Sequence, residues 1–222
     1  VFSGPAGFFQ ATIGPFTIER LGGQGVPFKL VESRIKRFPA GFYSQTAIEA
    51  ALQVRAYLPG PEAVKAVRLL TFEQGKRVMA DGPAKWRPPN RETADHSLPY
   101  VIAIALLYGG VEVRHFADEY LFSPQVEAMM QKVQVEVGQA SLRAWPEAIL
   151  NELEVETSDG RCLTAQVPYH KGHPRNPMGR QDLEEKFRSL TRDLLPARQA
   201  ADLLEHLWRL EQVEDLQRLL AL

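Results

Sequence analysis

The feature that most constrains this chain is an uninterrupted apolar run from Tyr100 to Tyr108. Ser97 and Pro99 come just before the run, and Gly109-Gly110 follows it. Serine at the N-cap and proline in the first turn are typical of a helix start, and glycine is typical of a helix end. The run is too short to span a bilayer, which takes about 20 residues. A helix that is apolar on nearly all sides must therefore be buried at the centre of a folded domain.

Patterns on either side of this helix predict further elements. A helix begins at an N-cap Ser44 and runs to about Leu58. Residues 64–79 place apolar side chains on one face of a strand, and residues 133–137 alternate valine with polar residues as a second strand. The polar, proline-rich stretch 81–92 between them is typical of a loop.

The last third of the chain predicts a hairpin and then helices. Residues 150–156 and 161–167 flank Ser158-Asp159-Gly160, a turn sequence typical of a β-hairpin. Residues 181–222 form three helical stretches broken near Pro196 and Glu211. The order of strand, helix, hairpin and terminal helices predicts an α+β fold with a helical appendix.

Composition excludes several classes of function. With 26 Lys and Arg against 27 Asp and Glu, the net charge of −1 lacks the basic surplus of a non-specific nucleic-acid binder. The single cysteine, Cys162, excludes an internal disulfide, a thiolate zinc site and a four-iron cluster held by this chain. No secretory signal is evident. We expect a soluble cytoplasmic protein with no membrane partner.

Two polar segments lie just ahead of predicted helices. Lys36-Arg37 precedes the helix that starts near Ser44, where backbone N–H groups and the helix dipole attract anions. The segment from Arg91 to His96, which includes Asp95, precedes the buried helix, where desolvation shifts pKa values. The alternative reading is that the first pair is merely solvated and that Asp95 and His96 only cap a helix.

Other candidate sites give weaker signals. His170 and His173 could ligate a metal, but no third ligand has suitable spacing, so we expect a flexible surface loop and no metal site. Cys162 lies in a hairpin strand, where a half-buried structural thiol is the expected reading.

Several ordered stretches together resemble the C-terminal portion of the MmgE/PrpD family, and the Arg91–Tyr100 stretch looks most like its 2-methylcitrate dehydratase branch. The resemblance covers essentially the whole chain. It is carried by Phe2-Ser-Gly-Pro-Ala-Gly-Phe8, Lys36-Arg-Phe-Pro-Ala40, Ser44-Gln-Thr-Ala47, Lys85-Trp-Arg-Pro88, Arg91-Glu-Thr-Ala-Asp-His-Ser-Leu-Pro-Tyr100, Asp159-Gly160, Lys171-Gly-His-Pro-Arg-Asn-Pro177 and Glu185-Lys-Phe187.

The resemblance implies an architecture. Residues 1–31 would be a connecting loop and strand segment from a helical domain that is absent here. Residues 32–178 would be a two-layer α+β lid, with an antiparallel or mixed sheet and helices on one face. Residues 179–222 would be helices that belong with the helical domain, and the site would lie in the cleft between the two domains.

The resemblance also implies a reaction and a set of site residues. It suggests part of a cofactor-independent lyase, acting as a homodimer, that dehydrates a small tricarboxylate such as 2-methylcitrate in propionate catabolism. His96 and Tyr100 are the expected catalytic, cleft-lining groups, and Lys36, Gln45 and Arg91 are the expected substrate-binding groups.

Two positions depart from the family pattern. Gly41 stands where the decarboxylase branch has a histidine, and Gly41-Phe-Tyr43 stands where dehydratases tend to have Glu-Phe-His. Epimerisation, decarboxylation and a non-catalytic binding or dimerisation module are therefore the alternatives. Because no complete acid–base set is evident in the sequence, we expect this chain alone to be inactive.

Overall fold

The computed structural model describes residues 7–8 and 21–217 of the chain. The chain divides into two compact units, Val1–Arg34 and Ile35–Leu222. The described part of the first unit contains a short 3₁₀ helix at Lys29–Glu32. Most of the loop and strand predicted for residues 1–31 lies outside the described residues. Every element discussed below belongs to the second unit.

A four-stranded mixed sheet organises the second unit, as the α+β prediction requires. Its strand order is β2-β1-β3-β4. Strands β1 and β2 are parallel, whereas β3 runs antiparallel to both β1 and β4. The strands are β1 (Val64–Thr71), β2 (Val133–Val137), β3 (Asn151–Thr157) and β4 (Cys162–Val167).

Helices and single turns fill the connections between these strands. The α-helices are α2 (Gln45–Arg55), α3 (Glu73–Met79), α4 (Pro83–Trp86), α5 (Arg91–Ala94), α6 (Leu98–Tyr108), α7 (Asp118–Leu121), α8 (Pro124–Met130), α9 (Gln139–Ala144), α10 (Arg180–Thr191) and α11 (Ala197–Leu207). Four 3₁₀ helices, at Phe42–Ser44, Pro61–Ala63, Val113–Phe116 and Leu210–Gln212, complete the described part of this unit. None of the described helices is long and apolar enough to cross a membrane.

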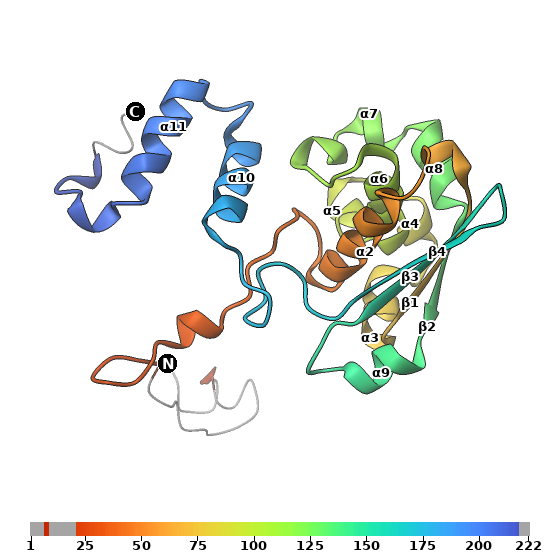
Figure 1. Ribbon diagram of the computed structural model, residues 1–222, viewed down its shortest axis with the longest axis horizontal. Helices are drawn as coiled ribbons and strands as arrows, with labels where there is room; N and C mark the ends of the chain where they lie inside the picture. Colours follow the sequence, from red (N-terminus) through yellow and green to blue (C-terminus); the bar gives the residue numbers. More distant parts are fainter. Residues whose placement is uncertain (1–6, 9–20, 218–222) are drawn as a thin grey trace. The chain divides into compact units, whose positions relative to one another are not determined.

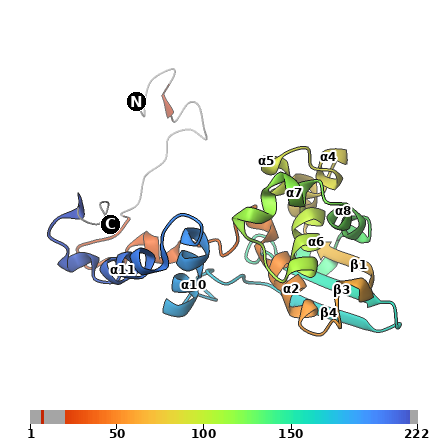
Figure 2. The ribbon, with the colours of Figure 1, turned by 90° about the horizontal axis from the view of Figure 1, so that it is seen from above.

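Helix α6 is the centre of the core, which confirms the prediction from its apolar run. Every residue from Leu98 to Leu107 is buried. The Ser97 hydroxyl accepts a hydrogen bond from the Tyr100 amide at 3.2 Å, and Gly109 ends the helix with φ of 74°. Helices α6 and α2 pack together and cover one face of the sheet (Figures 1 and 2).

The opposite face of the sheet carries charged side chains. Arg68 on β1 forms ion pairs with Glu136 on β2, at 2.8 Å, and with Glu154 on β3, at 3.3 Å. Lys65 pairs with Glu156 at 2.6 Å on the same two central strands. All five side chains are more than a third exposed, so this face is solvated rather than packed.

Several local predictions were wrong. Ser44 occupies the predicted N-cap position of α2, but its side chain does not cap the helix: Ser44 ends a 3₁₀ turn with helical backbone angles, and its hydroxyl donates to the Gly41 carbonyl at 2.8 Å. Helix α2 ends at Arg55 rather than near Leu58. The strand predicted over residues 64–79 stops at Thr71, because the good helix formers that follow build α3.

The segment 81–92 and Cys162 also differ from expectation. Short helices α4 and α5 occupy parts of the predicted loop, the second capped by Asn90, whose side chain accepts from the Thr93 amide at 2.9 Å. Cys162 is exposed rather than half-buried, because it lies on an edge strand and faces away from the helices. The hairpin of β3 and β4 is confirmed.

Candidate functional site

Two segments far apart in sequence meet at the starts of α2 and α6. The Gly41 amide donates a hydrogen bond to the Asp95 carbonyl at 2.7 Å. Gly41 leads through the Phe42–Ser44 turn into α2, and Asp95 lies three residues before α6. The structure therefore brings the loop that carries Lys36 beside the segment that carries His96.

His96 pairs with its neighbour in sequence. Its Nδ1 contacts the Oδ1 atom of Asp95. The side chain of His96 is 46% exposed and that of Asp95 24%, so the pair lies at the surface of the described residues. A carboxylate that holds one ring nitrogen leaves the other free to exchange a proton with a ligand.

Gln45 is buried, and its side-chain amide makes hydrogen bonds with all of its donors and acceptor sites. Its Oε1 accepts from the amides of Arg37 and Phe38, each at 3.0 Å, and its Nε2 donates to the carbonyls of Phe38 and Ala40 at 3.1 and 3.2 Å. A glutamine side chain has two donors and two acceptor sites, so none remains for a substrate. The geometry gives Gln45 the task of shaping the Lys36 loop.

Lys36 has a fixed backbone and an exposed side chain. Its carbonyl accepts from the Lys186 Nζ at 2.5 Å, and the preceding amide, of Ile35, donates to the Gly172 carbonyl at 2.9 Å. Burial and the charge of Lys36 lower the pKa of Lys186. The like charges of Lys36 and Lys186 act on each other, and two cations in one loop region favour binding of an anion.

Arg91 begins α5 and is exposed. Within the described residues Arg91 forms no ion pair, and neither of the neighbouring carboxylates, Glu92 and Asp95, is bound to it. The guanidinium can therefore bind a carboxylate without first breaking a contact.

Tyr100 lies inside the core rather than at a surface. Its side chain is fully buried, and its hydroxyl donates to the His115 carbonyl at 2.5 Å. Burial raises the pKa of the Tyr100 hydroxyl, and the nearby Tyr108 adds to the rise. These contacts give Tyr100 a packing role. The apolar run that begins at Tyr100 already predicted a buried helix, whereas the expectation of a cleft-lining Tyr100 came from the resemblance.

The loop expected to be flexible is instead anchored, which the sequence did not reveal. His170 and His173 are buried, and the His170 ring lies edge-on to Phe42 with centroids 5.4 Å apart. The Lys171 amide donates to Glu49 of α2 at 2.7 Å. Burial raises the pKa of Glu49, against the lowering effect of this hydrogen bond. The loop therefore braces the start of α2 and the Lys36 segment.

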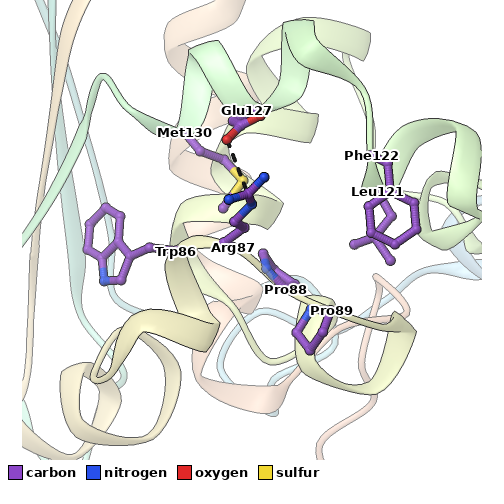
Figure 3. Close-up of a pocket in the computed structure, with 8 residues that line it drawn as sticks. All are labelled: Trp86, Arg87, Pro88, Pro89, Leu121, Phe122, Glu127 and Met130. Carbon is purple, nitrogen blue, oxygen red and sulfur yellow. Dashed lines mark ion pairs between the residues drawn. The ribbon is translucent and has the colours of Figure 1, made fainter.

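A separate cavity of about 390 Å³ lies between the C-terminal end of α4, with the residues that follow it, and helices α7 and α8. Figure 3 shows its lining. Arg87 reaches toward Glu127 at 4.0 Å across it. The other lining residues are Trp86, Pro88, Pro89, Leu121, Phe122 and Met130. None of the predicted site residues lines this cavity, and no described group of three His, Cys, Asp or Glu residues could hold a metal ion.

The comparison with known proteins decides the family. Residues 38–212 match the model of the MmgE/PrpD C-terminal domain. The chain belongs to the MmgE/PrpD family. It is 31% identical over 218 residues to 2-methylcitrate dehydratase of Escherichia coli K12. The aligned region covers 92% of this chain and 41% of that protein.

Two other relatives show the range of activities within the MmgE/PrpD family. The chain is 32% identical over 176 residues to 2-methylcitrate dehydratase of Cupriavidus necator, covering 74% of the chain and 36% of that protein. It is 28% identical over 214 residues to human cis-aconitate decarboxylase, covering 94% of the chain and 43% of that protein. The chain thus spans less than half the length of these relatives.

Proposed function

We propose that the polypeptide containing this chain is a cofactor-independent lyase that dehydrates a small tricarboxylate such as 2-methylcitrate. The observation that carries the proposal is the bond between Gly41 and Asp95, which joins a cationic loop to a histidine–carboxylate pair. Removing a proton next to a carboxylate and expelling hydroxide requires a base and cations that hold the carboxylates. Relatives named as dehydratases support this reaction.

In this proposal each exposed group has one task. Lys36 and Arg91 bind substrate carboxylates, Arg91 in a bidentate manner and Lys36 as a compact charge. His96 handles the proton. Gln45 and Tyr100 act indirectly, by holding the Lys36 loop and the start of α6.

Decarboxylation is the second candidate, because the human relative is named cis-aconitate decarboxylase. One experiment separates the two reactions. The full-length polypeptide is incubated with 2-methylcitrate or citrate, where the alkene product absorbs in the ultraviolet, and separately with cis-aconitate, where release of CO₂ is measured. Alkene formation supports dehydration, whereas release of CO₂ alone contradicts it.

Substitution of the two cations tests the binding roles. Lys36→Met or Arg91→Met should lower kcat/KM about 10²-fold, since a desolvated charge-assisted contact is worth about 1.5–3 kcal/mol. The melting temperature should barely change, because neither side chain has an ion-pair partner among the described residues. Lys65→Met and Arg161→Met are the control variants, because these cations form ion pairs with Glu156 and Asp159 and are not assigned to the site. They should leave kcat/KM unchanged. Full turnover in both site variants would contradict the assignment.

The helical domain and the homodimer implied by the resemblance stay predictions, as does the cytoplasmic location expected from the sequence. The 222-residue chain assayed alone should show no turnover, because in this proposal the rest of the polypeptide supplies part of the site. Clear turnover by the chain alone would contradict this division of the site.

A further inference from the structure

Gly41 is glycine for reasons of space rather than backbone conformation. Its φ of −52° and ψ of 147° are accessible to any L-residue. A Cβ atom at this position would lie 2.6 Å from Met79 Cε and 3.1 Å from His96 Cδ2. The missing side chain therefore lets the imidazole of His96 lie directly against the loop.

Asp95 completes the placement of this ring. Its backbone carbonyl accepts from the Gly41 amide at 2.7 Å, while its carboxylate contacts Nδ1 of His96. An ionised carboxylate only accepts hydrogen bonds, so this contact favours the neutral tautomer with its proton on Nδ1 and its lone pair on Nε2. Gly41 leaves room for the His96 ring, and Asp95 favours one of its two tautomers.

We propose that Gly41 and Asp95 are positioning residues that present Nε2 of His96 as the proton acceptor in the reaction. This inference rests on the proposed function, which supplies the substrate. Nε2 takes the proton from the carbon next to a substrate carboxylate. The C–H electron pair forms the C=C bond as the C–O bond breaks, and the imidazolium returns the proton to the departing hydroxide, which leaves as water.

The tautomer can be measured in the 222-residue chain without any activity. Long-range ¹H–¹⁵N spectra distinguish a protonated from an unprotonated ring nitrogen at each histidine. His206 is an internal reference, because its Nδ1 contacts the Asp202 carbonyl at 2.7 Å, remote in sequence from Gly41 and Asp95. We expect neutral His96 to carry its proton on Nδ1.

Two variants should weaken or remove this preference at His96 and leave His206 unchanged. Asp95→Ala deletes the carboxylate. In Gly41→Ala the new Cβ lies 3.1 Å from His96 Cδ2, so the ring shifts by a few tenths of an ångström and its contact with Asp95 weakens. If Gly41→Ala alone fails to fold, Gly41→Ala with Met79→Ala relieves the closer contact and keeps the conflict with His96. A proton on Nε2 in the unsubstituted chain, or an unchanged His96 in the variants, would overturn the positioning.

Activity of the full-length polypeptide tests the chemical role. Asp95→Ala should lower kcat by about 10²–10⁴-fold with little change in KM, the range expected for acid–base catalysis. His96→Gln should abolish exchange of the substrate α-proton with solvent deuterium. Retained exchange would overturn the role of His96 even where dehydration occurs. Absence of dehydration in the unsubstituted enzyme would instead count against the proposed function, while the tautomer measurement still decides the positioning.

Discussion

Replacing Gln45 by Met tests whether this residue shapes the Lys36 loop or binds substrate. Methionine keeps nearly the same length and volume but removes both the donor and the acceptor. Four backbone groups lose their partner, namely the amides of Arg37 and Phe38 and the carbonyls of Phe38 and Ala40. Since Gln45 is fully buried, water does not replace its side chain without opening the structure.

The expected loss follows from the number of bonds. A typical hydrogen bond contributes about 0.5–1.5 kcal/mol net, so four bonds correspond to a loss of roughly 2–6 kcal/mol. For a protein of this size each kcal/mol lowers the melting temperature by about 2–4 °C. The lower bound therefore predicts a fall of at least about 4 °C.

Urea unfolding followed by tryptophan fluorescence gives the free energy, and amide hydrogen exchange locates the loss. The amides of Arg37 and Phe38 should lose protection first. Gln53→Met is the matched control, because Gln53 lies on the same helix with its side chain exposed. If Gln45→Met changes stability no more than Gln53→Met, and instead raises KM in the full-length enzyme, Gln45 binds substrate and our reading of its hydrogen bonds is wrong.

Three further substitutions test individual features. Ser97→Ala removes the cap of α6 and should lower the free energy of unfolding by about 0.5–2 kcal/mol. The dependence of that free energy on urea concentration should not change. Gly172→Ala should lower the free energy of unfolding by at least about 1–3 kcal/mol, because the glycine has φ of +99° and a Cβ would lie 2.1 Å from the Ile35 carbonyl oxygen. Since the Ile35 amide donates to the Gly172 carbonyl, this amide should also exchange faster. Burial raises the pKa of Glu49 above 4.5, so the folded protein binds that proton more tightly than the unfolded chain, and stability falls as pH rises from 4.5 through the raised value. Glu49→Gln should remove that fall in urea titrations while still accepting from Lys171, and an unaltered pH dependence would contradict the assignment.

The core and the sheet were largely predictable, because their signals are local and periodic. The apolar run with Ser97 before it and Gly109 after it gave the boundaries of α6, and the Asp159-Gly160 turn gave the hairpin. The strand ends at Thr71, where the apolar alternation also stops, because the polar residues Glu73 to Arg77 begin α3; extending the predicted strand to Met79 ignored this change of pattern. Ser44 was misread because its hydroxyl donates backward to Gly41 instead of accepting from the helix.

The candidate site was only partly predictable, because its contacts are long-range. The two polar segments are brought together by the packing of α2 against α6 and by the hydrogen bond between Gly41 and Asp95, neither of which has a local sequence signal. The sequence does not indicate that Gln45 is buried, since a glutamine at the start of an amphipathic helix can be either exposed or buried. The pair of Asp95 and His96 is adjacent in sequence and could be found, whereas the space above Gly41 exists only in the folded chain.

The strand order determines when this domain can form during synthesis. Strand β1 lies between β2 and β3, and its Leu69 pairs with Val135 and Leu153, which are synthesised later. At about 5–20 residues per second, the roughly 80 residues between Leu69 and Leu153 take the ribosome ~4–16 s. Helix α6 is made within that interval, and its apolar surface has no complete sheet to cover it. A nascent chain stalled before β3 should therefore bind a chaperone that recognises apolar segments, and extension past β4 should release it.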